Sequence, residues 1–158
     1  MERIILPAGM LALAIITACF LFTTGGLGAL LIVLITAMLG LALFRQFSDD
    51  KQFVTMIFVG ALAARLVFGF IVHALDLRDF FGGDANTYDN FGNELLLRWT
   101  GAVSIPNPVV DYRLNDIGSG WGMYDLVAAI YYVLGRNILA AQSFCAVIGA
   151  STAPMASG

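Results

Sequence analysis

Long apolar stretches separated by short polar breaks dominate the chain. Residues 4–44 contain no charged side chain. As a single helix they would be about 60 Å long, twice the thickness of the hydrocarbon core of a bilayer. The segment 23–26, Thr-Thr-Gly-Gly, is the turn signal inside this stretch. The pattern therefore predicts two helices, over residues 4–22 and 27–44.

Three further apolar stretches follow a polar break at residues 45–52. One of them, residues 53–75, is interrupted by Arg65 and His73. We predict an all-α fold, a polytopic membrane helix bundle with about five transmembrane helices. Its expected parts are a helical hairpin (1–44), a third span (53–75), an extracytoplasmic loop (76–120), and a fourth and fifth span (121–156).

Composition agrees with a bilayer environment. Hydrophobic residues make up 59% of the chain and charged residues 12%, against about 45–50% and 25% in ordinary globular proteins. The net charge is −3 and no Lys/Arg run occurs, so we expect a lipid bilayer and no nucleic acid as partner. The acidic pairs Asp76/Asp79 and Asp111/Asp116 match no ligand spacing, so neither a metal site nor a cofactor is predicted.

Basic residues next to the apolar stretches indicate an orientation. Arg3, Arg45, Lys51 and Arg136 all flank one side if the N-terminus is cytoplasmic. The 76–120 loop is then extracytoplasmic, and the protein is expected to be a multi-pass protein of the plasma (inner) membrane. The first apolar stretch is longer than the usual core of a signal peptide, so we expect a retained span.

The polar loop contains a predicted amphipathic helix beginning at Asp84. Tyr88, Phe91, Leu95 and Trp99 recur at spacings of three and four, which places them on one face. This face is expected to lie in the headgroup region, to pack on the spans, or both. Asp89 lies off the aromatic face, so we expect Asp89→Asn to be a control that leaves turnover unchanged.

Asp84 has two possible roles. It is suited to cap the helix N-terminus, or it serves as a catalytic carboxylate at the membrane surface. Burial raises the pKa of a carboxylate and makes it a better base, whereas a helix N-terminus favours the anion. The sequence leaves this balance open.

Arginines offer two further alternatives. Arg65, near the middle of its span, is expected to be paired, with Asp125 as a plausible partner, or to bind an anionic ligand. Arg78, Arg98 and Arg113 are either solvated loop charges or phosphate-binding groups.

Residues 83–88, Gly-Asp-Ala-Asn-Thr-Tyr, followed by Gly92 and the leucine pair at 95–96, resemble a motif of membrane glycosyltransferases of the GT-C class. The likeness is greatest to the family 39-like group, which includes protein O-mannosyltransferases and lipid A aminoarabinose transferases. Residues 128–135 resemble that group's A-x-x-Y-x-L-F-G helix end, and residues 140–142 and 149–150 resemble its following helix. Arg65 is similar to an arginine often found before the loop.

This resemblance implies transfer of a sugar from a polyprenyl-phosphate donor to a glycan, lipid or protein acceptor. It implies that Asp84 takes the proton from the acceptor hydroxyl. The candidate substrate-binding residues are Tyr88, Arg65 and Arg78. The chain departs from the pattern of this group in three ways. Segment 120–124 replaces a proline-rich entry to the next span, and an additional hairpin at 1–44 precedes the helix that usually comes first. The chain is also shorter than those of family members. We therefore expect the N-terminal part of such an enzyme, inactive as the isolated 158-residue chain.

Two other function classes remain open. One is a non-enzymatic membrane subunit, such as an assembly or transport protein of envelope polysaccharide biosynthesis, whose loop is an interaction surface. The other is a different polysaccharide enzyme, such as a repeat-unit polymerase or a flippase-like protein.

Overall fold

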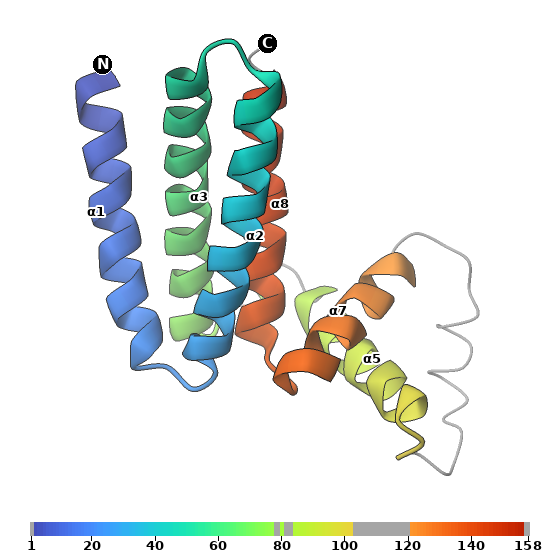
Figure 1. Cartoon of the computed structure of the whole chain (residues 1–158). Helices are drawn as coiled ribbons and strands as arrows, with labels where there is room; N and C mark the ends of the chain where they lie inside the picture. Colours follow the sequence, from blue (N-terminus) through green and yellow to red (C-terminus); the bar gives the residue numbers. More distant parts are fainter. Residues whose placement is uncertain (1, 78–79, 81–83, 103–120, 157–158) are drawn as a thin grey trace. The chain divides into compact units, whose positions relative to one another are not determined.

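The computed structural model describes residues 2–77, 80, 84–102 and 121–156. Within these ranges the chain is helical and has no strand (Figure 1). The helices are α1 (Glu2–Leu21), α2 (Gly26–Phe47), α3 (Lys51–Ala74), α5 (Asp84–Trp99), α7 (Trp121–Leu134) and α8 (Ile138–Ala156). The predicted all-helical fold is confirmed.

The chain divides into two compact units. The four-helix unit consists of Met1–Leu75 and Leu139–Gly158, and it contains α1, α2, α3 and nearly all of α8. The inserted unit is Asp76–Ile138 and contains α5 and α7. The sequence-based division instead joined residues 121–156 as two consecutive spans, whereas α7 packs with α5 in the structure.

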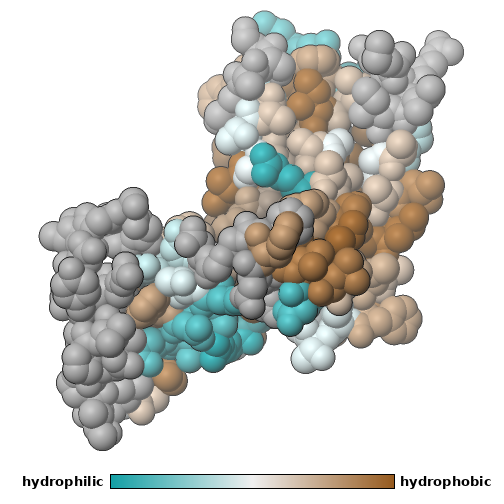
Figure 2. All heavy atoms as spheres, turned by 180° about the vertical axis from the view of Figure 1, so that it is seen from behind, coloured by the Kyte–Doolittle hydropathy of each residue, from teal (hydrophilic) through white to brown (hydrophobic). Residues whose placement is uncertain are grey.

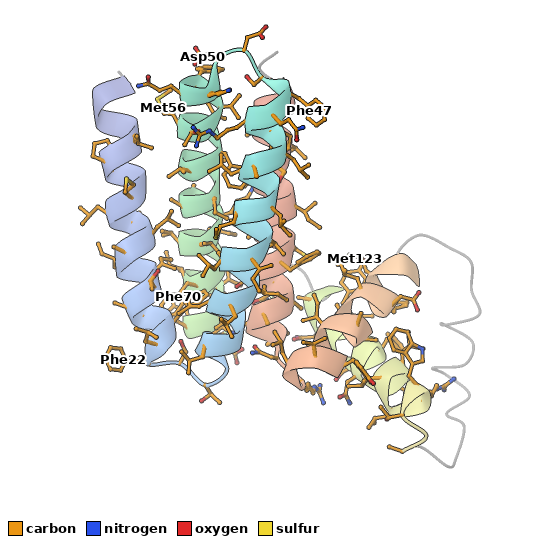
Figure 3. All side chains as sticks on the ribbon, viewed as in Figure 1. Phe22, Phe47, Asp50, Met56, Phe70 and Met123 are labelled. Carbon is orange, nitrogen blue, oxygen red and sulfur yellow. The ribbon has the colours of Figure 1, made fainter. Side chains whose placement is uncertain are left out.

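Short turns separate the first three helices, as the polar breaks predicted. Gly25 has a φ of 78°, and a Cβ on Gly26 would lie 1.7 Å from the carbonyl oxygen of Phe20, so the turn requires glycines. At the next turn Asp50 caps α3 by accepting a hydrogen bond of 2.9 Å from the Phe53 N–H (Figure 3). Local chemistry thus fixes both reversals.

Side-chain contacts define the directions of helices in the four-helix unit. The Phe20 and Phe70 rings, near the ends of α1 and α3, have centroids 5.5 Å apart, so these two helices run parallel. Gly149, in the second half of α8, lies against Arg65 of α3. Residues early in α8, such as Gln142, meet Phe70 late in α3, so α8 runs antiparallel to α3. The end of α3 and the start of α8 therefore lie at the same end of the unit (Figure 1).

The outer surface of the four-helix unit is strongly apolar. Figure 2 shows hydrophobic residues over much of the unit's visible face. Only 6% of the apolar stretch of α2 is buried within the molecule. Phe22 and Phe47, just before α2 and at its end, are 92% and 84% exposed and point away from the helices (Figure 3). By length and composition, α2 and α3 are able to cross a membrane, which indicates membrane association.

A close approach holds α5 and α7 together in the inserted unit. A Cβ built on Gly92 of α5 would lie 2.5 Å from Val127 Cγ1 and 2.7 Å from Val127 Cβ. Only a glycine lets the two helices meet at this distance. The adjacent residues Val127, Ala128 and Tyr131 of α7 are fully or almost fully buried.

Gly92→Ala is expected to separate α5 from α7. The clash is with a branched side chain close to its backbone, which cannot rotate away, so the free energy of unfolding should fall by about 1–3 kcal/mol. Gly122→Ala in α7 is the matched control, because its Cβ would meet nothing within 4 Å. Denaturant unfolding in detergent should show the first variant weakened and the second unchanged or slightly stabilised. Equal stability of the two would contradict the close approach.

Candidate functional site

The aromatic face predicted for α5 packs on α7. The Tyr124 ring of α7 lies between Tyr88 and Phe91, with ring centroids 5.5 Å and 5.3 Å away. Both pairs are tilted, at 49° and 56°, in the range that aromatic pairs favour. The face therefore packs on α7, the helix that was expected from the sequence to be the fourth span.

Asp89 is the centre of a polar network beside this cluster. Its Oδ1 accepts hydrogen bonds from the Tyr131 hydroxyl at 2.5 Å and from Arg136 Nε at 3.2 Å. Its Oδ2 accepts from Arg136 Nη2 at 2.5 Å, so the arginine grips the carboxylate with two nitrogens. Arg136 Nη2 also donates to Asn90 Oδ1 at 2.9 Å.

Helix geometry positions the members of this network. Tyr131 is one of the most deeply buried residues of α7, while Asp89 is 15% and Arg136 48% exposed in its side chain. Arg136 follows the end of α7, where Gly135 has a φ of 74° and ends the helix. A cation at a helix C-terminus is favourable, because the carbonyl groups there carry partial negative charge.

The electrostatics keep both donors protonated. Burial raises the pKa of the Tyr131 hydroxyl above its ordinary value, and the hydrogen bond to Asp89 raises it further. The hydrogen bond to Asp89 also raises the pKa of the Arg136 guanidinium. Tyr131 and Arg136 therefore act as fixed donors at any physiological pH, and the network is a clamp between α5 and α7.

This network corrects two expectations from the sequence. Asp89 was expected to be a neutral control for Asp84, but it connects α5 to α7 through both of its carboxylate oxygens. Arg136 was assigned to the side of the membrane opposite the 76–120 loop, which is incompatible with its contact to Asp89 of that loop. The physical reason is length, because the 14 residues of α7 span only about 21 Å, less than the hydrocarbon core.

The predicted site residues are distributed over both units. Asp84 is the first residue of α5, as predicted, and Tyr88 lies one turn later. Arg78 and the side chain of Asp84 lie outside the described residues, as does Arg113. Tyr88 is thus the one candidate whose side chain is defined in the inserted unit, where it contacts Tyr124.

Arg65 belongs to the four-helix unit. A Cβ on Gly149 would lie 2.8 Å from Arg65 Cζ and Nη1, so the guanidinium lies directly on the backbone of α8. Among the described residues Arg65 has no ion pair, and Asp125, the partner suggested by the sequence, lies on α7 of the inserted unit. A small cavity beside Arg65 is also lined by Gln142 and Ser143 of α8.

Sequence reasoning missed Asp89, Tyr131 and Arg136 as a set. They are 42 and 47 positions apart, and no periodicity connects residues at that separation. The one available signal was the scarcity of charge, because an acidic and a basic residue beside apolar helices tend to pair. Within the part of the chain that the structure describes, no three His, Cys, Asp or Glu side chains gather as metal ligands.

Comparisons of this chain with protein-family models, with curated proteins and with solved structures find no match.

Proposed function

We propose that the four-helix unit crosses the bilayer four times and that the inserted unit stays on one side. The support is the apolar exterior of α2 and α3 and their lengths of 22 and 24 residues, about 33 and 36 Å. Water would penalise so large an apolar surface, whereas lipid tails do not. The chain leaves the four-helix unit at the end of α3 and returns at the start of α8, and these two points lie at the same end of that unit. Its four helices therefore give an even number of crossings.

Cysteine labelling tests this topology. In a background with Cys19 and Cys145 replaced by alanine, single cysteines are placed at Asp49, Thr100 and Asn137. An impermeant thiol reagent added to whole cells should label the Thr100→Cys and Asn137→Cys variants. The Asp49→Cys variant should react only after the membrane is broken. If the Asn137→Cys and Asp49→Cys variants instead react under the same condition, α7 crosses the membrane and the fold has five spans.

On this architecture we further propose a membrane glycosyltransferase, which transfers a sugar from a polyprenyl-phosphate donor to an acceptor on the extracytoplasmic side. The observation that carries the proposal is that α5 begins at Asp84, the aspartate of the motif that resembles GT-C enzymes. The helix presents Tyr88 of the same motif one turn later, packed on the helix that ends in the second matching segment. The motif residues thus belong to one folded unit.

In the proposed reaction Asp84 removes the proton of the acceptor hydroxyl while its oxygen attacks the anomeric carbon. The bond from that carbon to the donor phosphate breaks, and the polyprenyl phosphate leaves with the electron pair. Arg78 is the proposed phosphate-binding residue, since guanidinium groups stabilise the charge of a departing phosphate. Tyr88 is the proposed substrate-binding residue of the inserted unit.

A transfer assay tests the activity. Membranes containing the protein are given radiolabelled polyprenyl-phosphate sugars, and labelled product is separated from donor. Membranes from cells lacking the gene are the control. Equal transfer in both kinds of membrane for every donor would refute the glycosyltransferase proposal.

A specific observation favours a second function, that of a non-enzymatic membrane subunit. Both carboxylate oxygens of Asp89 are engaged in the α5–α7 clamp, which holds these two helices together as a surface suited to bind a partner. In that case purification from native membranes should recover a larger membrane protein, and the Asp89 variants should lose it while Asp84→Asn retains it.

A further inference from the structure

A small pocket lies between α1, α3 and α8 in the four-helix unit, and its lining combines apolar side chains with three polar ones. Its volume is about 20 Å³. The polar residues that line it are Arg65, Gln142 and Ser143, and the remaining walls are mainly apolar, with Phe20, Leu66 and Phe70 among them. A void of this kind needs about 10–15 Å³ and two or more polar neighbours to hold a water molecule. The volume fits one water and is too small for a phosphate or a sugar.

Gln142 supplies the acceptor side of this site. Its Oε1 atom is buried and has no hydrogen-bond partner among the residues that the structure describes. A buried carbonyl oxygen without a donor is costly, and the cost is greater in the low-dielectric interior of a membrane bundle. Ser143, which is 3% exposed, adds a hydroxyl that can both donate and accept.

Arg65 supplies the donor side. Its guanidinium has five N–H groups and no acceptor, and no carboxylate pairs with it in the described ranges. The Arg65 side chain is exposed overall, and its guanidinium lies against α8, since a Cβ on Gly149 would be 2.8 Å from Arg65 Cζ and Nη1. A donor on α3 and an acceptor on α8 therefore face one small cavity without a direct bond between them.

We propose that this cavity binds one water molecule, which accepts a hydrogen bond from Arg65 and donates one to Gln142 Oε1. The water solvates part of the arginine's charge and satisfies the glutamine. It also joins α3 to α8 through a polar contact. This hydration site concerns the four-helix unit alone and does not depend on sugar transfer.

The variant Gln142→Met tests the site, because the two possibilities change the thermal unfolding midpoint in opposite directions. Methionine has nearly the shape of glutamine but no acceptor oxygen. If water bridges Arg65 and Gln142, the variant removes the bridge, and the thermal unfolding midpoint in detergent should fall by about 2–4 °C. If no water binds, the glutamine oxygen is only an unsatisfied acceptor, and its removal should raise the midpoint. A rise or an unchanged midpoint overturns the proposal.

A double-mutant cycle gives the second readout. With Arg65→Met as background, Gln142→Met should no longer lower the midpoint, because the donor of the bridge has gone. The conservative Gln142→Glu retains an acceptor facing the arginine, so its midpoint should equal or exceed that of the wild type. An equal fall from Gln142→Met in both backgrounds, or a fall in Gln142→Glu as large as in Gln142→Met, would show that the two residues act independently and would refute the bridge.

Discussion

In membranes that show sugar transfer, replacing Asp84 by asparagine is expected to lower the transfer rate by about 10²–10⁴-fold, the usual contribution of a general base. Asparagine has nearly the same size and stabilises helix starts about as well as aspartate, so α5 should still begin at residue 84. What the variant loses is the capacity to accept a proton. The initial rate at saturating donor and acceptor measures the effect, and the thermal unfolding midpoint should stay at its wild-type value.

Glu94→Gln is the matched control for Asp84→Asn. Glu94 lies on the same helix, and among the described residues it makes no hydrogen bond or ion pair. The two substitutions remove the same charge from α5, so a general electrostatic effect would slow both variants alike. Transfer at the wild-type rate by Asp84→Asn would show that Asp84 serves only the helix end, and the catalytic assignment would fail.

Asp89→Ala is expected to cause the largest loss of stability in the inserted unit. The variant removes the acceptor of three hydrogen bonds and leaves the buried Tyr131 hydroxyl without this partner. Loss of a hydrogen bond to a charged group costs up to about 3 kcal/mol, and we expect a fall of that size in the free energy of unfolding. Tyr131→Phe should cost about 1 kcal/mol, because Arg136 still holds the carboxylate.

Tryptophan fluorescence measures the free energy of unfolding of these variants in the inserted unit. The chain has two tryptophans, Trp99 and Trp121, and both lie in the inserted unit. Their emission during denaturant unfolding therefore follows α5 and α7 and not the four-helix unit. Arg136→Met should be the mildest of the three variants, at less than about 1 kcal/mol, because its side chain is 48% exposed and solvent screens the pair. Equal effects of Asp89→Ala and Arg136→Met would contradict a clamp centred on Asp89.

Local patterns predicted the helices well. The absence of charge from residue 4 to residue 44 and the glycine turn at 23–26 predicted α1 and α2 to within a few residues. The same reasoning placed the start of α5 at Asp84 and its aromatic side on Tyr88 and Phe91. These features depend on residues a few positions apart, where helical spacing leaves a visible signature.

Contacts between distant residues were beyond such reasoning. An apolar helix of 14 residues has the same pattern whether it crosses a membrane or packs on a neighbour, so α7 was expected to be a span. Its position on α5 depends on Gly92, Tyr131 and Asp89, and no local spacing connects them. The sequence located the start of α5 and placed Tyr88 on its aromatic face, while the clamp beside them appeared only in three dimensions.

The antiparallel contact of α3 with α8 has a consequence for how the chain folds. During synthesis α1, α2 and α3 emerge first and are able to associate at once, whereas α8 emerges only after the whole of Asp76–Ile138. Docking of α8 therefore closes a long loop. The entropic cost of closing a loop grows only with the logarithm of the loop's length, by about 0.6 kcal/mol for each doubling. Insertions in this segment should consequently be tolerated by the helix bundle far better than any change to its turns at Gly26 or Asp50, where single residues fix the reversal of the chain.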